Sequence, residues 1–224
     1  MRQLLSQYTL KLNENIYLKN PSESEVGLKI ISQGIELIAE IGIEQFTFRK
    51  LGQRIGSPES TIYRYFENKH KLLVYLISYY WCWLEYRLVF AMANIDSPEE
   101  RLHRALEVIT SDIEEDSNFS HINEVALHRI VISESAKVYL TKEVDAENKA
   151  GLFQVYQNLL ERLTNIIHEI NPKYPHPHTL MSMVIEGVHQ QKYFADHLPG
   201  LTELTTERTA RDFFVGLVFA SIKA

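Results

Sequence analysis

The sequence predicts an all-α protein, and three observations carry this prediction. Apolar residues recur at helical spacing in one segment after another, as in Val26, Ile30, Ile31, Ile35 and Ile38. No segment shows the strict alternation of polar and apolar residues that is typical of a β-strand. Capping residues, glycine stops and proline-rich stretches divide the chain into pieces of helical length.

An N-terminal arm is expected before the first helix. Residues 1–21 are polar with scattered apolar side chains, and the turn signal Asn20-Pro21 ends them. Ser22 followed by Glu25 is a capping-box pattern, which starts the first helix. Gly42 is expected to end that helix, since glycine is the common residue just past a helix C-terminus.

Three more helices are expected to follow closely. Thr47 caps a short second helix that Gly56 stops. Ser57-Pro58-Glu59 starts the third, because it supplies a capping serine, a proline at the first position and an acid in the first turn. Asn68 caps a long fourth helix. Beyond it, helices are expected near residues 98–115, 121–132, 134–147, 149–170, 177–197 and 206–222.

The second and third helices have the features of a DNA-reading helix-turn-helix. They are short, a tight turn joins them, and the third is rich in hydroxyl, aromatic and basic side chains. In such a motif the later helix enters the major groove. Gly52 lets the two helices approach closely, and the small core between them comes from Leu51, Ile55 and Ile62. A generic helical hairpin shares much of this pattern, so spacing alone leaves both interpretations open.

The segment from Ile30 to Leu76 resembles the TetR family of transcriptional regulators. The matching stretch is IISQGIELIAEIGIEQFTFRKLGQRIGSPESTIYRYFENKHKLLVYL, with GI-x-x-FT and TIYRYF-x-N-K-x-x-LL as its most specific parts. The resemblance implies a DNA-binding domain at residues 22–70 and a helical ligand-binding and dimerisation domain at residues 71–224. It also implies a ligand-responsive repressor that binds a palindromic operator in double-stranded DNA as a homodimer.

The resemblance further implies which side chains contact DNA. Thr47 and Lys69 match positions that reach phosphates, and Tyr63 matches a tyrosine that contacts a phosphate or a base. Tyr65 stands where the family often has histidine. The expected DNA-binding residues are Thr47, Arg49, Ser60, Thr61, Tyr63, Arg64, Tyr65 and Lys69.

Two positions depart from the family pattern. Ser57 stands where an apolar residue is preferred, and Glu59 where lysine or a small residue is commoner. Glu59 either accepts a hydrogen bond from a cytosine amino group or only stabilises its own helix dipole. The formal net charge is −6, but the charges of residues 22–78 balance, so DNA binding requires a clustered basic patch.

Aromatic residues crowd the fourth helix. They fit either ordinary core packing or the wall of a pocket for an unidentified small-molecule effector, and the resemblance favours the pocket. The residues expected to contact this ligand are Trp83, Tyr86, Glu85, Arg87, Phe90 and His128.

Wide apolar faces on the last two long helices are expected to pair across a two-fold axis as a four-helix bundle. Gly187 and Gly216 are small enough to allow the helices to approach closely. The expected interface residues are Met181, Val184, Ile185, Val188, Phe213, Phe214 and Leu217.

Other classes of protein find little support. A single cysteine, Cys82, and the lack of an HExxH pattern argue against a metal site. No cofactor is expected, and no P-loop or GxSxG elbow indicates an enzyme. The apolar stretch from Leu72 to Leu84 is shorter than the roughly 20 residues that span a bilayer, so a cytoplasmic protein without a membrane partner is expected. The alternative function is a helical ligand-binding or protein-interaction dimer whose helix-turn-helix has weak or no DNA affinity.

Overall fold

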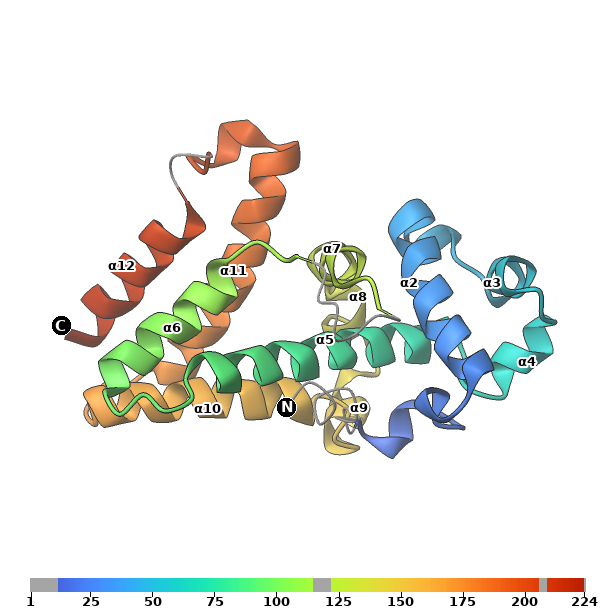
Figure 1. The fold of residues 1–224 in the computed structure, drawn as a ribbon, viewed down its shortest axis with the longest axis horizontal. Coiled ribbons are helices and arrows are strands. Elements are labelled where there is room, and N and C mark those ends of the chain that lie inside the picture. The colour runs from blue at the N-terminus through green and yellow to red at the C-terminus, as the bar shows by residue number, and fades with distance from the viewer. Residues whose placement is uncertain (1–11, 115–121, 206–208, 224) are drawn as a thin grey trace. The chain divides into compact units, whose positions relative to one another are not determined.

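The computed structural model describes residues 12–114, 122–205 and 209–223, and Figure 1 shows its course. The described residues form helices and turns without a β-strand, so the all-α prediction is confirmed. The chain divides into two compact units, one within Met1–Cys82 and Ile113–Val155, the other within Trp83–Asp112 and Tyr156–Ala224. The predicted domain boundary between residues 70 and 71 stays a prediction.

The first unit combines the N-terminal helices with three helices from the middle of the chain. Helix α2 lies against η2, α3 and α7. Phe46, Leu51, Ile62 and Phe66 are fully buried in its core. Its elements are η1 (Glu14–Ile16), η2 (Pro21–Glu23), α2 (Glu25–Gln45), α3 (Phe48–Ile55), α4 (Glu59–Tyr63), the first part of α5 (Lys69–Ala91), α7 (Glu124–Glu134), α8 (Ala136–Tyr139) and α9 (Val144–Lys149).

Two of the predicted helix starts agree with the structure, and the one at Ser22 does not. Thr47 caps α3, since its Oγ1 accepts a hydrogen bond from the Lys50 N–H at 3.2 Å. Asn68 likewise precedes α5 and accepts a hydrogen bond from the backbone of that helix. Both caps are confirmed. The cap predicted at Ser22 is wrong: Ser24 caps α2, because the turn that starts at Pro21 takes up Ser22.

Glycines shape the two turns that follow α2. Gly42 leaves helical geometry at φ 71° and ψ 159°, and one further turn follows it before the chain extends at Phe46. Gly56 adopts a left-handed conformation (φ 67°, ψ 33°) and ends α3 as predicted. The cap predicted at Ser57 is wrong, because α4 begins two residues later with Pro58 in the capping position.

The second unit contains the end of α5 and the remaining long helices. Its other elements are α6 (Pro98–Thr110), most of α10 (Gln154–Ile170), α11 (Pro177–His197), η4 (Pro199–Leu201) and α12 (Ala210–Lys223). The prediction for residues 177–197 is confirmed, and the others hold to within five residues at each end where the chain is described. The exception is 134–147, which is divided between α8 and α9 because the chain leaves helical geometry at Leu140, whose side chain is 83% exposed. Residues 1–11 of the predicted arm, and residues 115, 121 and 206–208 of the predicted helices, lie outside the described residues.

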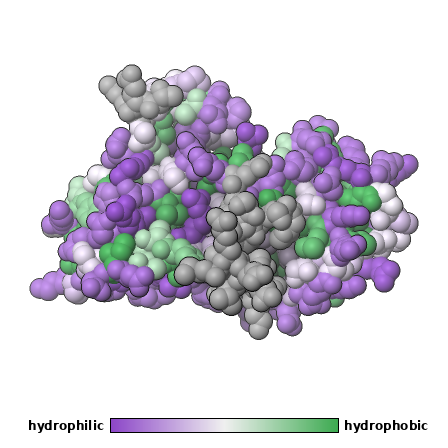
Figure 2. Space-filling model, in the orientation of Figure 1, coloured by the Kyte–Doolittle hydropathy of each residue, from purple (hydrophilic) through white to green (hydrophobic). Residues whose placement is uncertain are grey.

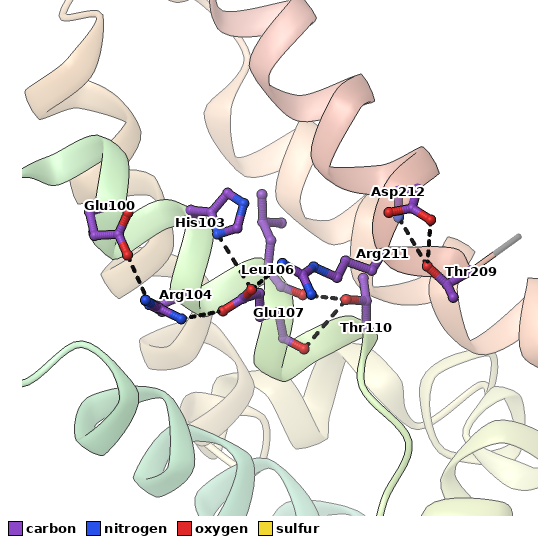
Figure 3. Close-up of polar contacts among 9 residues, drawn as sticks. All are labelled: Glu100, His103, Arg104, Leu106, Glu107, Thr110, Thr209, Arg211 and Asp212. Carbon is purple, nitrogen blue, oxygen red and sulfur yellow. Dashed lines mark hydrogen bonds and ion pairs between the residues drawn. The ribbon is translucent and has the colours of Figure 1, made fainter. Parts of the chain in front are cut away.

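A cluster of charged side chains joins α6 to the start of α12 (Figure 3). Glu107 is its centre, since its carboxylate meets Arg104 Nη1 at 3.0 Å and forms an ion pair with Arg211. His103 lies 3.7 Å from the same carboxylate. Exposed ion pairs contribute little individually, but this network fixes the first turn of α12 against α6.

Polar residues cover most of the face shown in Figure 2, with smaller apolar areas between them. Within the described residues, the helices are all too short or too polar to cross a membrane.

Candidate nucleic-acid interface

The turn between α3 and α4 depends on close backbone contact. The Ser57 N–H donates to the Gly52 carbonyl at 2.9 Å, and a Cβ at Gly52 would lie only 2.6 Å from the Ser57 oxygen. The predicted close approach at Gly52 is therefore confirmed. Leu51 and Ile62 are fully buried between the helices, whereas Ile55 is half-buried.

Most of the expected DNA-binding side chains lie on the surface of this motif. Six of the eight are exposed, Thr61 is half-buried and Tyr65 is buried. The exposed six are Thr47, Arg49, Ser60, Tyr63, Arg64 and Lys69.

Tyr63 is exposed and yet firmly placed. Its side chain is 49% exposed. Its ring packs edge-on against Phe48 of α3, with 4.9 Å between the ring centroids. This contact ties the recognition helix α4 to α3 and limits the freedom of the tyrosine before any ligand binds.

Tyr65 is not available to DNA in this structure, which corrects the expectation for this residue. Its side chain is 5% exposed, and its hydroxyl lies 2.8 Å from Ser24 Oγ. A side chain two positions beyond Tyr63 lies on a different side of the chain, and here that side faces the protein.

Lys69 holds the end of α2. Its ammonium donates to the carbonyls of Ile43 at 2.9 Å and Glu44 at 3.3 Å. A lysine carries three donors, so two are used within the protein and one remains for an outside acceptor. The expected phosphate contact is thus compatible with the observed structural role.

Ion pairs change the charge balance of this surface. Glu40 pairs with Arg54 at 2.7 Å and Glu44 with Lys137 at 2.9 Å. The hydrogen bonds in these pairs lower the pKa of both carboxyl groups, so both stay ionised and neutralise a neighbouring cation. Glu59 is exposed at the first residue of α4, a position where it stabilises the helix dipole.

Helix α7 binds the same region of α2 through side chains that sequence reasoning missed. Glu134 accepts a hydrogen bond from the Ile43 N–H at 3.1 Å. Asn123 donates to Glu36 at 2.9 Å. No local pattern marks these residues, because the partners are about 90 positions apart in sequence.

The expected ligand-binding residues are divided between the two units. In the second unit Trp83 is buried beneath the Arg87 guanidinium, 4.9 Å from its ring centroid, while Phe90 is 52% exposed beside Tyr86. Glu85 forms an ion pair with Arg162 at 2.9 Å. His128 belongs to the first unit, where its Nδ1 lies 2.9 Å from the Tyr80 hydroxyl.

The expected dimer residues on α11 need correction. Met181, Ile185 and Val188 are fully buried within the second unit, because the side of α11 that carries them packs into the core. The exposed large apolar residues are Met183 and Tyr193 on α11, at 66% and 39% exposure, and Phe213 and Leu217 on α12, at 60% and 41%. Phe214 and Val184 are also almost entirely buried.

A groove of about 780 Å³ lies between α11 and α12. It is mostly apolar, and none of the six expected ligand-binding residues lines it. Its lining residues include Leu180, Met183, Val184, Gly187, Leu201, Leu204, Phe213, Phe214 and Leu217. Among the described residues, histidine, cysteine and carboxylate side chains form no group of three that could hold a metal ion.

Comparisons with known proteins agree with this geometry. The model of a family described as "Bacterial regulatory proteins, tetR family" matches residues 30–76. A putative TetR-family transcriptional regulator from Rhodococcus sp. has a similar structure, with a TM-score of 0.61 and 17% identity over 87% of this chain and 97% of that one. The fatty acid degradation regulator FadR from Bacillus halodurans has a TM-score of 0.59 and 19% identity, over 84% of this chain and 97% of that one. AibR, solved with isovaleryl coenzyme A and operator DNA, has a TM-score of 0.54 and 20% identity, over 84% of this chain and 95% of that one. No curated protein sequence matches the chain.

The fold and the exposed face of α3 and α4 define a helix-turn-helix protein. The segment that matches the model of the tetR family of bacterial regulatory proteins, residues 30–76, contains both helices of this motif. The three structural likenesses show that the same fold continues through the C-terminal helices.

The contact between Glu134 and the kink of α2 leads to a test of stability. Glu134→Ala leaves the Ile43 N–H buried without its acceptor, which costs about 1–3 kcal/mol of unfolding free energy. Urea denaturation measures this reduction. The matched control is Glu143→Ala, at an exposed position beyond α8, and equal unfolding free energies for the two variants would contradict the assignment.

Proposed function

We propose that the protein is a ligand-responsive repressor that binds a palindromic operator as a homodimer in the cytoplasm. The observation that carries this proposal is the exposed row of hydroxyl, aromatic and basic side chains on α3 and α4, within a TetR-type domain. Its role is regulatory rather than enzymatic. The proposed DNA-binding residues are Thr47, Arg49, Ser60, Thr61, Tyr63, Arg64 and Lys69.

These residues are proposed to make two kinds of contact with DNA. Thr47, Tyr63 and Lys69 sit at the ends of helices, where they meet phosphates and fix the position of the protein on the duplex. Ser60 and Thr61 lie in the first turn of α4, which enters the major groove and meets the edges of the bases. The first group supplies affinity, and the second supplies sequence preference.

A second candidate is a ligand-binding or protein-interaction dimer with weak DNA affinity. Two observations favour it: Glu59 is an exposed acid at the start of α4, and the Lys69 ammonium is already bound to α2. Salt separates the candidates, because phosphate contacts release counterions and make DNA affinity fall steeply as salt rises. Selection of bound sequences from random duplexes tests the leading proposal directly and supplies the operator.

The groove between α11 and α12 supports the dimer. Met183, Phe213 and Leu217 expose apolar surface around it. A second copy of the same face covers this surface in a two-fold arrangement. The two recognition helices must then lie about 34–36 Å apart to meet successive major grooves.

An effector is proposed because AibR, a similar structure, was solved with both isovaleryl coenzyme A and operator DNA. Here the aromatic residues Trp83 and Tyr86, with Arg87, are the proposed contacts. Helix α5 runs unbroken from Lys69 to these residues. A ligand that shifts α5 therefore changes how far apart the recognition helices lie.

The DNA contacts predict two kinds of variant. Tyr63→Ala and Lys69→Ala weaken binding to all sequences. Lys69→Ala also lowers the slope of log affinity against log salt by about 1, because only the lysine neutralises a phosphate charge. Ser60→Ala and Thr61→Ala instead change the preferred sequence. Fluorescence anisotropy over a salt series measures both effects. Arg104→Gln, on α6, is the control, and unchanged affinity in both Tyr63→Ala and Lys69→Ala would refute the phosphate assignment.

The dimer predicts a matched pair of surface variants. Leu217→Glu places a charge in the apolar face, so light scattering at micromolar concentration shows a monomer and operator binding is abolished. Leu140→Glu places the same charge at a more exposed leucine outside that face and leaves the dimer intact. A wild-type monomer, or dissociation by both variants, would count against this interface.

Ligand response predicts a reciprocal effect. An effector that releases DNA must bind the free protein more tightly than the operator complex, by about 5–150-fold for a coupling of ~1–3 kcal/mol. Isothermal titration of isovaleryl coenzyme A into the two forms is the first measurement. Equal affinity of a ligand for both forms would exclude it as the regulator.

A further inference from the structure

Residues 12–24, here called the N-terminal strap, are held on the first unit by buried side chains. Ile16 is 1% exposed and Leu12 is 6% exposed. The ring of Tyr17 meets Tyr75 of α5 edge-on, with 6.2 Å between the centroids. Burial of this apolar surface keeps the strap in place.

One part of the strap contacts Tyr65, which lies two residues beyond the end of the recognition helix. The Leu18 N–H donates to the Tyr65 carbonyl at 2.8 Å, and Ser24 Oγ lies 2.8 Å from the Tyr65 hydroxyl. The Lys19 ammonium lies 5.2 Å from the centroid of the same ring. The strap therefore contacts the backbone, the hydroxyl and the ring face of Tyr65.

The other end of the strap is bonded to the end of α9. The side-chain amides of Asn13 and Asn15 both donate to the Ala150 carbonyl, at 3.1 and 3.2 Å. This carbonyl belongs to the residue after α9, where the last carbonyls of a helix need outside donors. The two asparagines thus join the strap to α9.

Helix α9 is in turn bound to the first turn of α5. The buried carboxylate of Glu147 accepts hydrogen bonds from Lys71 Nζ at 2.8 Å and His70 Nε2 at 3.0 Å. Burial by itself would raise the pKa of Glu147, but the Lys71 and His70 hydrogen bonds outweigh it and lower the pKa. The carboxylate stays ionised and fixes α9 beside Lys69, where a phosphate contact is proposed.

The recognition helix needs such support. Helix α4 has five residues, and its capping residue, Pro58, makes no side-chain hydrogen bond to the first turn. Helices this short are unstable by themselves. Its direction therefore depends on what holds its two ends: Gly52 and Ser57 at the start, and Tyr65 at the end.

We infer that the strap and α9 position the recognition helix for DNA, with Tyr65 as the positioning residue through which they act. This inference rests on the proposed function, since it concerns the binding of DNA by the same helix. A helix held in its binding orientation loses less conformational entropy when it enters the groove, so the strap increases specific affinity without touching DNA.

The test uses two variants that weaken the strap contacts and one control variant, all in the full-length protein. Tyr65→Phe removes the hydroxyl that meets Ser24 and keeps the buried ring. A double variant, Asn13→Ala with Asn15→Ala, releases the strap from α9. Tyr156→Phe is the control, because it removes a tyrosine hydroxyl that donates to Glu186 at 3.2 Å in the second unit.

Two measurements are made on each variant. Hydrogen exchange on the DNA-free protein is expected to become faster at residues 18–24 and 63–66 in both strap variants and to stay unchanged in the control. Anisotropy is expected to show a specific affinity about three- to ten-fold lower, the effect of removing one or two hydrogen bonds. The affinity for random duplex and the salt slope are expected to stay as in the wild type, because every phosphate contact is kept.

Each other outcome has a defined meaning. Faster exchange with an unchanged ratio of specific to non-specific affinity would show that the strap only stabilises the fold, which overturns the inference. An equal loss of affinity for the operator and for random duplex in Tyr65→Phe would make Tyr65 a direct phosphate contact, which also overturns it. A wild-type protein that binds no duplex would instead refute the proposed function itself, and the inference with it.

Discussion

The positive-φ kink at Gly42 is the constraint around which α3, α5 and α7 contact the end of α2. Because its φ is 71°, the α-helical hydrogen bonding of α2 is interrupted and the backbone groups after it need partners elsewhere. Side chains from other helices supply them. Glu134 accepts from the Ile43 N–H, Lys69 donates to the Ile43 and Glu44 carbonyls, and Lys50 donates to the Gln45 carbonyl at 2.8 Å. Helices α3, α5 and α7 therefore meet at one short piece of backbone.

This arrangement gives the DNA-binding motif two connections to the rest of the chain. One is α5, which starts at Lys69 and continues into the second unit. The other is α7, which is joined to α2 by Asn123 near one end and Glu134 at the other. A movement of α7 thus reaches α2 without passing through α5. Since the Ile43 N–H is buried and costly to leave unbonded, its hydrogen bond to Glu134 opposes a separation of α7 from α2.

The sequence was sufficient for features that depend on local chemistry. Thr47 bonds to a backbone group three residues away, and Gly52 and Gly56 are required by a turn of a few residues. The same reasoning failed where the partner is distant. Ser22 and Ser57 look like good caps, but the turn at Pro21 and the later start of α4 take them out of the capping position. The bond between Glu134 and Ile43 spans 91 positions, so no local pattern could reveal it.

The faces of α11 show the same limit for packing. Apolar residues lie on more than one side of this helix, so its periodicity alone does not say which side is internal. Met181, Ile185 and Val188 pack into the second unit, which leaves Met183 on the open side. Gly187 then has a role inside one subunit, since a Cβ there would lie 3.1 Å from the Phe214 ring. The groove beside α12 exists because α11 buries its larger apolar face internally and presents a narrower one outward. In the proposed dimer a second copy is therefore recognised by few large side chains, and Phe213 and Leu217 carry most of the exposed apolar surface on α12.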